Sequence, residues 1–305
     1  MAEIGPAAAA VAEDAVAAVW CWVDGEPGEG LPIFDRGLQF GDGLFETFAV
    51  IDGLIPRWAG HRDRLRQGLA RLHFPGELLA TLDSEVQHLV AGVRGAWVGK
   101  LIVTRGNSFR GYRIPADSAP RRILVLQPWP RRPVTHWRDG VTVRLCDIRL
   151  GSQPALAGVK HLNRLEQVLA RAEWQGESPA EGLMCDQRGR LTEGTMSNLF
   201  LRRGRRVVTP ALLECGVAGV MREWVIDWLL RRSDYELFYE SVAPEDLGGV
   251  DELFLTNSLI GIWPILRVDG IARAEWPAGP CARALQAAVA SAMPWLSNGY
   301  DGPLG

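Results

Sequence analysis

The residue most suited to covalent chemistry is Lys160, in the segment GVKHLNRLEQVLARAEW (158–174). The chain has one other lysine, Lys100, and arginine supplies the remaining cationic side chains. Of these two residue types, only lysine offers an amine that readily loses its proton and attacks a carbonyl carbon. Burial, or nearby cations such as His161 and Arg164, would lower the pKa of that amine. Lys160 is therefore a candidate Schiff-base residue, and an ordinary solvated lysine before a helix is the alternative.

A second candidate is Glu193, in the segment LTEGTMSNLF (191–200). A buried carboxylate needs hydrogen-bond donors around it, and this segment contains hydroxyl and amide side chains that could serve. Glu193 could then accept a hydrogen bond from a protonated ring nitrogen. An exposed carboxylate in a turn is the alternative.

Three further features could bind an anion. The segment CGVAGVMR (215–222) is a glycine-containing loop that we expect to open a helix. Backbone N–H groups at such a helix start favour anions, although the segment matches neither a Walker A nor a Rossmann motif. Thr256, Asn257 and Ser258 follow a predicted strand and could add donors, and Arg64 could add a bidentate guanidinium.

One ligand would satisfy all of these groups. It has an aldehyde for Lys160, a basic ring nitrogen for Glu193, and a phosphate for Arg64 and the two anion-binding segments. Pyridoxal 5'-phosphate (PLP) has all three groups. The combination is much more specific than any of its parts, and it predicts PLP as the cofactor.

The elements that must position these residues indicate an α+β fold. Residues 44–57 predict a hairpin around the Asp52-Gly53 turn, and residues 60–74 predict an amphipathic helix. A further helix is predicted over 161–174, with its apolar stripe formed by Leu162, Leu165, Val168, Leu169 and Ala172. Residues 180–194 and 196–210 predict two successive hairpins, each turning at a glycine.

The chain divides into two α+β domains near residue 130, where QPWPRRPV contains three prolines. The expected organisation is a disordered N-terminal extension (1–18), a smaller domain (19–126), a linker (127–134) and a larger cofactor-binding domain (135–298).

Composition excludes several functional classes. The net charge of -3 argues against a nucleic-acid partner. The five cysteines form no CxxC pair, which argues against a zinc site and for free thiols in a reducing compartment. The N-terminus lacks the basic region of a signal peptide, and no apolar run approaches the ~18 residues of a membrane span. We expect a cytoplasmic protein with no membrane segment and no metal.

Several segments, in this order along the chain, resemble those of the fold-type IV PLP enzymes, over roughly residues 20 to 290. This superfamily includes branched-chain and D-amino-acid aminotransferases and 4-amino-4-deoxychorismate lyases. KHLNRLEQVLAR and DRGLQFGDG are most similar to the lyases, whereas branched-chain enzymes carry a tyrosine near the place of Leu165. The other segments that carry the resemblance are GHRDRLRQGLARL, RGNSFRGY, LTEGTMSNLF and CGVAGVMREWV.

The resemblance implies a role for each matching residue. Lys160 would hold PLP covalently and act as the catalytic base, and Glu193 would pair with the pyridinium nitrogen. The phosphate would be bound by Arg64, the backbone of Gly219, Val220 and Met221, and Ser258 with its neighbours Thr256 and Asn257. Val217 would pack against the ring, and Arg110 and Tyr112 would lie toward the substrate.

The resemblance also implies a homodimer acting on a small molecule, either as a lyase that forms 4-aminobenzoate and pyruvate or as an aminotransferase of D-amino acids, branched-chain amino acids or amines. Leu38 stands where some lyases carry a threonine, so it offers no hydroxyl for proton transfer. His161 and Arg164 have no assigned role. The alternative from a different functional class is a non-catalytic protein that binds an anion or a nucleotide through residues 215–222.

Overall fold

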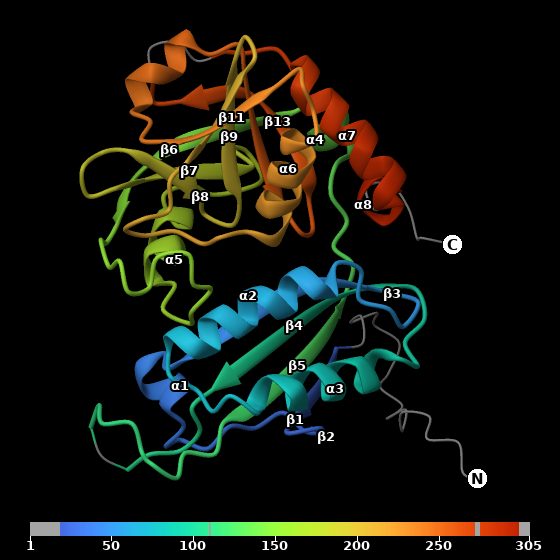
Figure 1. The fold of residues 1–305 in the computed structure, drawn as a ribbon, viewed down its shortest axis with the longest axis vertical. Helices are drawn as coiled ribbons and strands as arrows, with labels where there is room; N and C mark the ends of the chain where they lie inside the picture. Colours follow the sequence, from blue (N-terminus) through green and yellow to red (C-terminus); the bar gives the residue numbers. More distant parts are fainter. Residues whose placement is uncertain (1–18, 110, 272–274, 299–305) are drawn as a thin grey trace.

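The computed structural model describes residues 19–109, 111–271 and 275–298, so the predicted N-terminal extension lies outside the described residues. The chain forms a two-domain α+β fold (Figure 1). The smaller domain lies below the larger one in that view, and the green segment after β5 connects them.

The smaller domain is built on a five-stranded antiparallel sheet in the order β2-β1-β5-β4-β3. Helices α2 and α3 pack on it, and leucine, valine and phenylalanine side chains from both layers form one hydrophobic cluster. The elements are β1 (Trp20–Val23), β2 (Glu26–Pro27), α1 (Arg36–Phe40), β3 (Gly43–Ile51), α2 (Trp58–Arg71), α3 (Leu78–Val90), β4 (Ala96–Thr104) and β5 (Arg121–Pro128).

The larger domain is built on an eight-stranded mixed sheet in the order β11-β10-β9-β12-β13-β6-β7-β8. Two hydrophobic clusters pack against this sheet, one of them formed largely with α6 and α7. The elements are α4 (Val134–Arg138), β6 (Val141–Leu150), α5 (Leu165–Arg171), β7 (Glu181–Asp186), β8 (Leu191–Gly194), β9 (Asn198–Arg203), β10 (Arg206–Pro210), α6 (Val220–Leu230), β11 (Glu236–Glu240), the 3-10 helix η1 (Pro244–Gly249), β12 (Glu252–Asn257), β13 (Gly261–Asp269), α7 (Pro280–Ala292) and α8 (Pro294–Asn298).

Helix α2 lies where the two domains meet (Figure 1). Two glycines of this helix sit at close approaches, because a Cβ on Gly68 would lie 2.9 Å from Leu44 of β3 and one on Gly60 would lie 2.8 Å from Val220 of α6. Small residues therefore let α2 pack between its own sheet and the larger domain. Arg64, midway along α2, is placed at this junction.

The two hairpins predicted over 180–210 are confirmed as β7–β8 and β9–β10. The hairpin predicted at Asp52-Gly53 is confirmed as a turn, across which Ile51 and Leu54 exchange backbone hydrogen bonds at 2.8 and 3.0 Å, but its second strand does not form. Only a single bridge, Ile51 with Leu54, follows β3 before the chain enters α2. The β-branched residues after the turn are too few to form a second strand before Pro56.

The helix predicted over 161–174 is also shorter than expected, since α5 covers Leu165–Arg171 only. Its predicted apolar stripe does not face a core, because Leu165, Val168 and Leu169 are 76%, 59% and 56% exposed. A periodic pattern shows that one face is apolar but not what covers that face.

None of the helices described here is long and apolar enough to cross a bilayer. Within the same residues, no group of three or more histidine, cysteine, aspartate or glutamate side chains is placed to hold a metal ion.

Candidate active site

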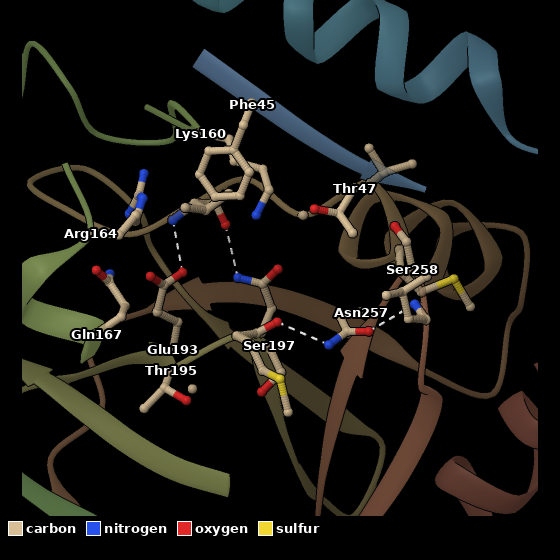
Figure 2. A pocket seen from close by; sticks show the side chains of 18 of the residues that line it. Phe45, Thr47, Lys160, Arg164, Gln167, Glu193, Thr195, Ser197, Asn257 and Ser258 are labelled. Carbon is tan, nitrogen blue, oxygen red and sulfur yellow. Dashed lines mark hydrogen bonds between the residues drawn. The ribbon is translucent and has the colours of Figure 1, made fainter. Parts of the chain in front are cut away.

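A cavity of about 320 Å³ lies between the two domains and contains Lys160 and Glu193 (Figure 2). Both domains contribute to its wall, β3 and α2 from the smaller and the remaining segments from the larger. The lining residues are Phe45, Thr47, Arg64, Arg132, Lys160, Arg164, Gln167, Glu193, Gly194, Thr195, Met196, Ser197, Asn198, Val217, Gly219, Val220, Met221, Asn257, Ser258 and Leu259.

Lys160 lies on an extended segment that backbone hydrogen bonds hold on both sides. Its carbonyl accepts from the N–H of Phe45 at 3.0 Å, on β3 of the smaller domain. Gly158, two residues earlier, exchanges backbone hydrogen bonds with Gly216 and Ala218 of the loop before α6, at 2.9 and 3.0 Å. The lysine is therefore fixed between the two domains, without belonging to a regular element.

The amine of Lys160 lies 4.2 Å from the centre of the Phe45 ring. Burial and the neighbouring Arg64 guanidinium lower its pKa to about 7, although Glu46 and Glu193 act in the opposite direction. A substantial fraction of this amine is consequently neutral near pH 7. A neutral amine is the form that attacks a carbonyl carbon or accepts a proton.

Glu193 projects from β8 and is almost completely buried. Its Oε2 accepts the backbone N–H of Val217 at 2.8 Å. Burial raises the pKa of this carboxyl to about 7, against the opposing effects of that hydrogen bond and of Arg164 and Lys160. A ligand with a protonated nitrogen would supply the cationic partner that Glu193 lacks in its hydrogen bonding.

The loop that precedes α6 is held close to β9. Gly216 has φ +86°, a conformation that glycine adopts without strain. Gly219 is the N-cap of α6, and a Cβ there would lie 2.1 Å from Oδ1 of Asn198, so no larger side chain fits. Asn198 also donates to the Val217 carbonyl at 2.9 Å. These contacts turn the start of the eleven-residue helix α6 toward the cavity, where its free N–H groups favour an anion.

Arg64 is held by a buried carboxylate that the sequence analysis missed. Its Nε donates to Oε1 of Glu46 at 2.8 Å, and its Nη2 donates to Oε2. Its Nη1 donates to the carbonyl of Ala218 at 3.0 Å, which links α2 to the loop before α6. The guanidinium is thus fixed at the cavity wall beside the start of α6.

Glu46 is 1% exposed and also bonds to Nδ1 of His61, at 2.7 Å. Burial alone would raise the pKa of this carboxyl, but Arg64 and His61 outweigh it and lower the pKa to about 2. Burial in turn lowers the pKa of His61, so the imidazole is neutral and its Nδ1–H donates to Glu46. Glu46 and Arg64 form a charged pair, and His61 completes its hydrogen bonding.

The structure brings most of the predicted site residues together. Nine of the predicted site residues line the cavity: Lys160, Glu193, Arg64, Val217, Gly219, Val220, Met221, Asn257 and Ser258. Thr256 is fully buried but does not line the cavity. The Asn257 side chain bonds to the Met196 carbonyl and to the N–H groups of Leu259 and Ile260, so it shapes the strand end.

The predicted substrate residues do not reach the cavity within one chain. Leu38 lies on α1 and is 64% exposed, and Tyr112 is 84% exposed and packs its ring on Phe40 at 5.3 Å. Neither lines the cavity. Arg110 lies outside the described residues.

A signal for Glu46 was present in the sequence. In the strand LFETF, Glu46 is in phase with Leu44 and Phe48, which face the core of the smaller domain. A carboxylate at such a position needs a buried partner, and His61 and Arg64 lie on one face of a helix at a spacing of three residues. Arg132 and Gln167 gave no comparable signal, because their place at the cavity depends on the packing of the two domains.

The chain belongs to the class IV aminotransferase family, whose model matches residues 43–268. It is similar to the crystal structure of 4-amino-4-deoxychorismate lyase from Pseudomonas aeruginosa, with 45% sequence identity, a TM-score of 0.85, and coverage of 90% of this chain and 99% of that chain. The aminodeoxychorismate lyase of Vibrio harveyi is 34% identical over 269 residues, which are 87% of this chain and 97% of the relative. A hypothetical aminotransferase from Mycobacterium tuberculosis in a PLP-bound form shares the fold, with 20% identity, a TM-score of 0.74, and coverage of 90% of this chain and 98% of that chain.

These comparisons confirm the family and the two-domain α+β fold that the sequence predicted. This family consists of PLP-dependent enzymes.

Proposed function

We propose that this protein is a PLP-dependent lyase that converts 4-amino-4-deoxychorismate to 4-aminobenzoate and pyruvate, a step toward folate. The observation that carries this proposal is the likeness to the Pseudomonas aeruginosa lyase over nearly the full length of both chains. The residues of the cavity supply the groups that such a reaction needs.

The cavity residues fit PLP in size and in chemistry. The volume of the cavity is within the usual range for small-molecule sites. Lys160 offers an amine that is partly neutral near pH 7 for the aldehyde, and Glu193 offers a buried carboxyl for the ring nitrogen. Arg64, Ser258 and the start of α6 form one anion-binding side for the phosphate. Val217 would pack against the ring.

The bound cofactor would supply an electron-accepting ring joined to the substrate amine. Lys160, once displaced by that amine, would take the proton from the substrate carbon that bears the nitrogen. Glu193 would keep the ring nitrogen protonated, and Arg64 would hold the phosphate in place. These roles need no group beyond those that already line the cavity.

Enolpyruvate would leave from the adjacent carbon as the substrate ring becomes aromatic, and its carbon must then be protonated. Leu38 has no hydroxyl and lies away from the cavity within one chain, so we assign this proton to Lys160, directly or through a water molecule. The proton that Lys160 removed in the first step is the one it returns.

We further propose a cytoplasmic homodimer. Two exposed apolar surfaces support a second copy as the partner. One is the outer face of α5, formed by Leu165, Val168 and Leu169, and the other comprises Phe34, Leu38, Phe109 and Tyr112. In such a dimer Leu38 and Tyr112, which do not reach the cavity of their own chain, would lie at the interface with the second copy. We keep residues 19–126 and 135–298 as the proposed domain bounds, joined by a linker over 127–134.

The test is release of 4-aminobenzoate from 4-amino-4-deoxychorismate by purified protein without any amino acceptor. We expect turnover together with a visible absorbance band from the lysine-bound cofactor. Lys160→Ala should abolish both, whereas Lys100→Ala, at an exposed position of β4, should retain both. Turnover by Lys160→Ala without added amine would contradict the proposed role of Lys160.

An aminotransferase acting on D-amino acids, branched-chain amino acids or amines is the second candidate, because the family model is described by that activity. The two candidates share all the cofactor residues discussed above. Conversion of the cofactor to its amine form by D-alanine or L-leucine, with no acceptor-free release of 4-aminobenzoate, would favour the aminotransferase.

A further inference from the structure

Arg164 and Gln167 line the same end of the cavity, and neither has a role in the proposal above. They lie three residues apart at the start of α5 and therefore project from one face of it. Figure 2 shows both on the side of Glu193, with Ser258 on the opposite side of the pocket. The cavity thus has a second polar end, away from the anion-binding side formed by Arg64, Ser258 and α6.

The guanidinium of Arg164 is fixed to the segment that carries Lys160. Its Nε donates to the carbonyl of His161 at 2.9 Å, and its Nη2 donates to the carbonyl of Val159 at 2.8 Å. These carbonyls belong to the two residues that flank Lys160. The position of this cation is therefore set relative to the lysine itself.

Arg164 and Arg64 differ in their partners. Arg64 is paired with Glu46, whereas Arg164 makes no ion pair with a carboxylate in the part of the chain that the structure describes. Its hydrogen bonds go to neutral carbonyls, and burial lowers its pKa, against the opposing effect of the nearby carboxylates of Glu193 and Glu166. The neighbouring Gln167 has a buried Oε1 that finds no hydrogen-bond partner among the described residues. A partly buried cation without an ion pair and an unsatisfied amide at one wall point to a polar ligand group there.

The cofactor of the proposed function would carry one further anionic oxygen that the side chains at this end of the cavity could bind. Lys160 would hold the aldehyde carbon, Glu193 would pair with the ring nitrogen opposite to it, and Arg64 would bind the phosphate arm. In pyridoxal the two ring positions next to the aldehyde carbon carry the phosphate arm and the phenolic oxygen. If the arm points toward Arg64, the phenolic oxygen points toward Arg164.

We infer that Arg164 is a cofactor-contacting residue that binds the phenolate oxygen of PLP, with Gln167 completing this polar end of the cavity. This inference rests on the proposed function. Arg164 would thereby neutralise the phenolate and orient the ring between Lys160 and Glu193. The two arginines would divide the anionic groups of the cofactor between them, with Arg64 at the phosphate and Arg164 at the phenolate.

The inference predicts a measurable change in the pKa of the imine nitrogen that would join Lys160 to the cofactor. A fixed cation beside the phenolate disfavours a further proton on the lysine-bound imine nitrogen, so it lowers the pH at which that nitrogen loses its proton. Removing the charge of Arg164 should raise this midpoint by about 1 pH unit, as expected for a charge a few ångströms away in a partly screened site. The other charged or titratable groups around Lys160 are Arg64, Glu46, Glu193 and His61, and they are unchanged in this comparison.

The experiment is a spectroscopic pH titration of the cofactor-loaded protein, which follows the visible band of the lysine-bound cofactor. Arg164→Gln should shift the midpoint upward by about 1 pH unit, and Arg164→Lys, which keeps the charge, should leave it within about 0.3 of the wild-type value. Arg171→Gln is the matched control. It lies in the last turn of α5, and its guanidinium bonds to the carbonyls of Trp174 and Gly176, away from the cavity.

An unchanged midpoint in Arg164→Gln, together with a raised KM for the substrate, would overturn the inference and assign the guanidinium to the substrate. A merely structural role would weaken cofactor binding in both Arg164 variants without a shift of the midpoint, which would also overturn it. Should Arg164→Gln fail to fold, Arg164→Leu with the Arg164→Lys titration makes the same comparison. Failure of the proposed function is distinguishable, because a wild-type protein that shows the visible band but releases no 4-aminobenzoate without an acceptor would contradict the lyase and leave this inference standing.

Discussion

Two glutamates face the region of Lys160 from opposite domains, and both are almost completely buried. Glu46 of β3 is held by Arg64 and His61, and its pKa is lowered to about 2. Glu193 of β8 accepts one backbone hydrogen bond, and its pKa is raised to about 7. The partner, and not the extent of burial, decides whether a buried carboxylate stays ionised.

The difference separates two kinds of contribution to the site. The negative charge of Glu46 is already compensated by Arg64 in the protein alone, so this pair stabilises the fold and fixes Arg64. The carboxyl of Glu193 is incompletely compensated, so its burial costs folding free energy in the protein alone. A ligand with a protonated nitrogen would supply the missing partner. Ligand-binding regions of proteins commonly carry such local costs in folding free energy.

The largest effect should come from Glu193→Gln, which removes the carboxylate that lacks a charged bonding partner. Loss of a preorganised charge opposite the ring nitrogen should lower kcat about 10²–10³-fold. The cofactor-free protein should be as stable as the wild type or more stable, because an amide is cheaper to bury than an ionised carboxyl. Steady-state assays and urea unfolding of the cofactor-free protein would measure both; a marked loss of stability would contradict the comparison.

Glu46→Gln should produce the opposite pattern, with a stability loss as its main effect. The substitution leaves the Arg64 cation buried without its counter-charge, which should cost about 3 kcal/mol of unfolding free energy. Because Arg64 also loses its bidentate anchor, cofactor affinity should fall by about 10-fold or more. Urea unfolding and PLP titration of the cofactor-free protein are the measurements.

Glu240→Gln is the matched control for that variant. Glu240 pairs with Arg206 at 2.7 Å, but both side chains are exposed. Exposed ion pairs contribute little, so unfolding free energy should change by about 0.5 kcal/mol or less. A similar loss in both glutamate variants would mean that burial of the Glu46 pair has no special weight.

The smallest effect concerns acid stability. The folded-state pKa of Glu46, about 2, lies below its ordinary value of 4.5. The stabilisation from its ionised form is therefore complete above about pH 4.5 and is lost as the pH falls from 4.5 to 2. At pH 3.5 the wild type should have lost about 1 kcal/mol from this group, and Glu46→Gln should lack this part of the pH dependence. Equal slopes in wild type and variant over that range would contradict the assigned pKa.

Local patterns predicted much of the chain because they depend on neighbouring residues. The glycine turns of β7–β8 and β9–β10 and the helical spacing in α2 were sufficient to place those elements. The turn predicted at Asp52-Gly53 formed, but the second strand did not, because turn residues alone do not supply one. The long helix over 161–174 failed because backbone bonds to β3 keep residues 160 and 162 extended. Such bonds join residues more than a hundred positions apart.

The amino-acid sequence by itself determined the family, the α+β class and the set of groups that call for PLP, because these rest on residue types in a recognisable order. Tertiary structure decided which of those groups meet. It placed Lys160, Glu193 and Arg64 around one cavity, left Leu38 and Tyr112 outside it, and brought in Glu46, Arg164 and Gln167. It also set the proton affinities, since a pKa depends on desolvation and on charges that only folding brings near.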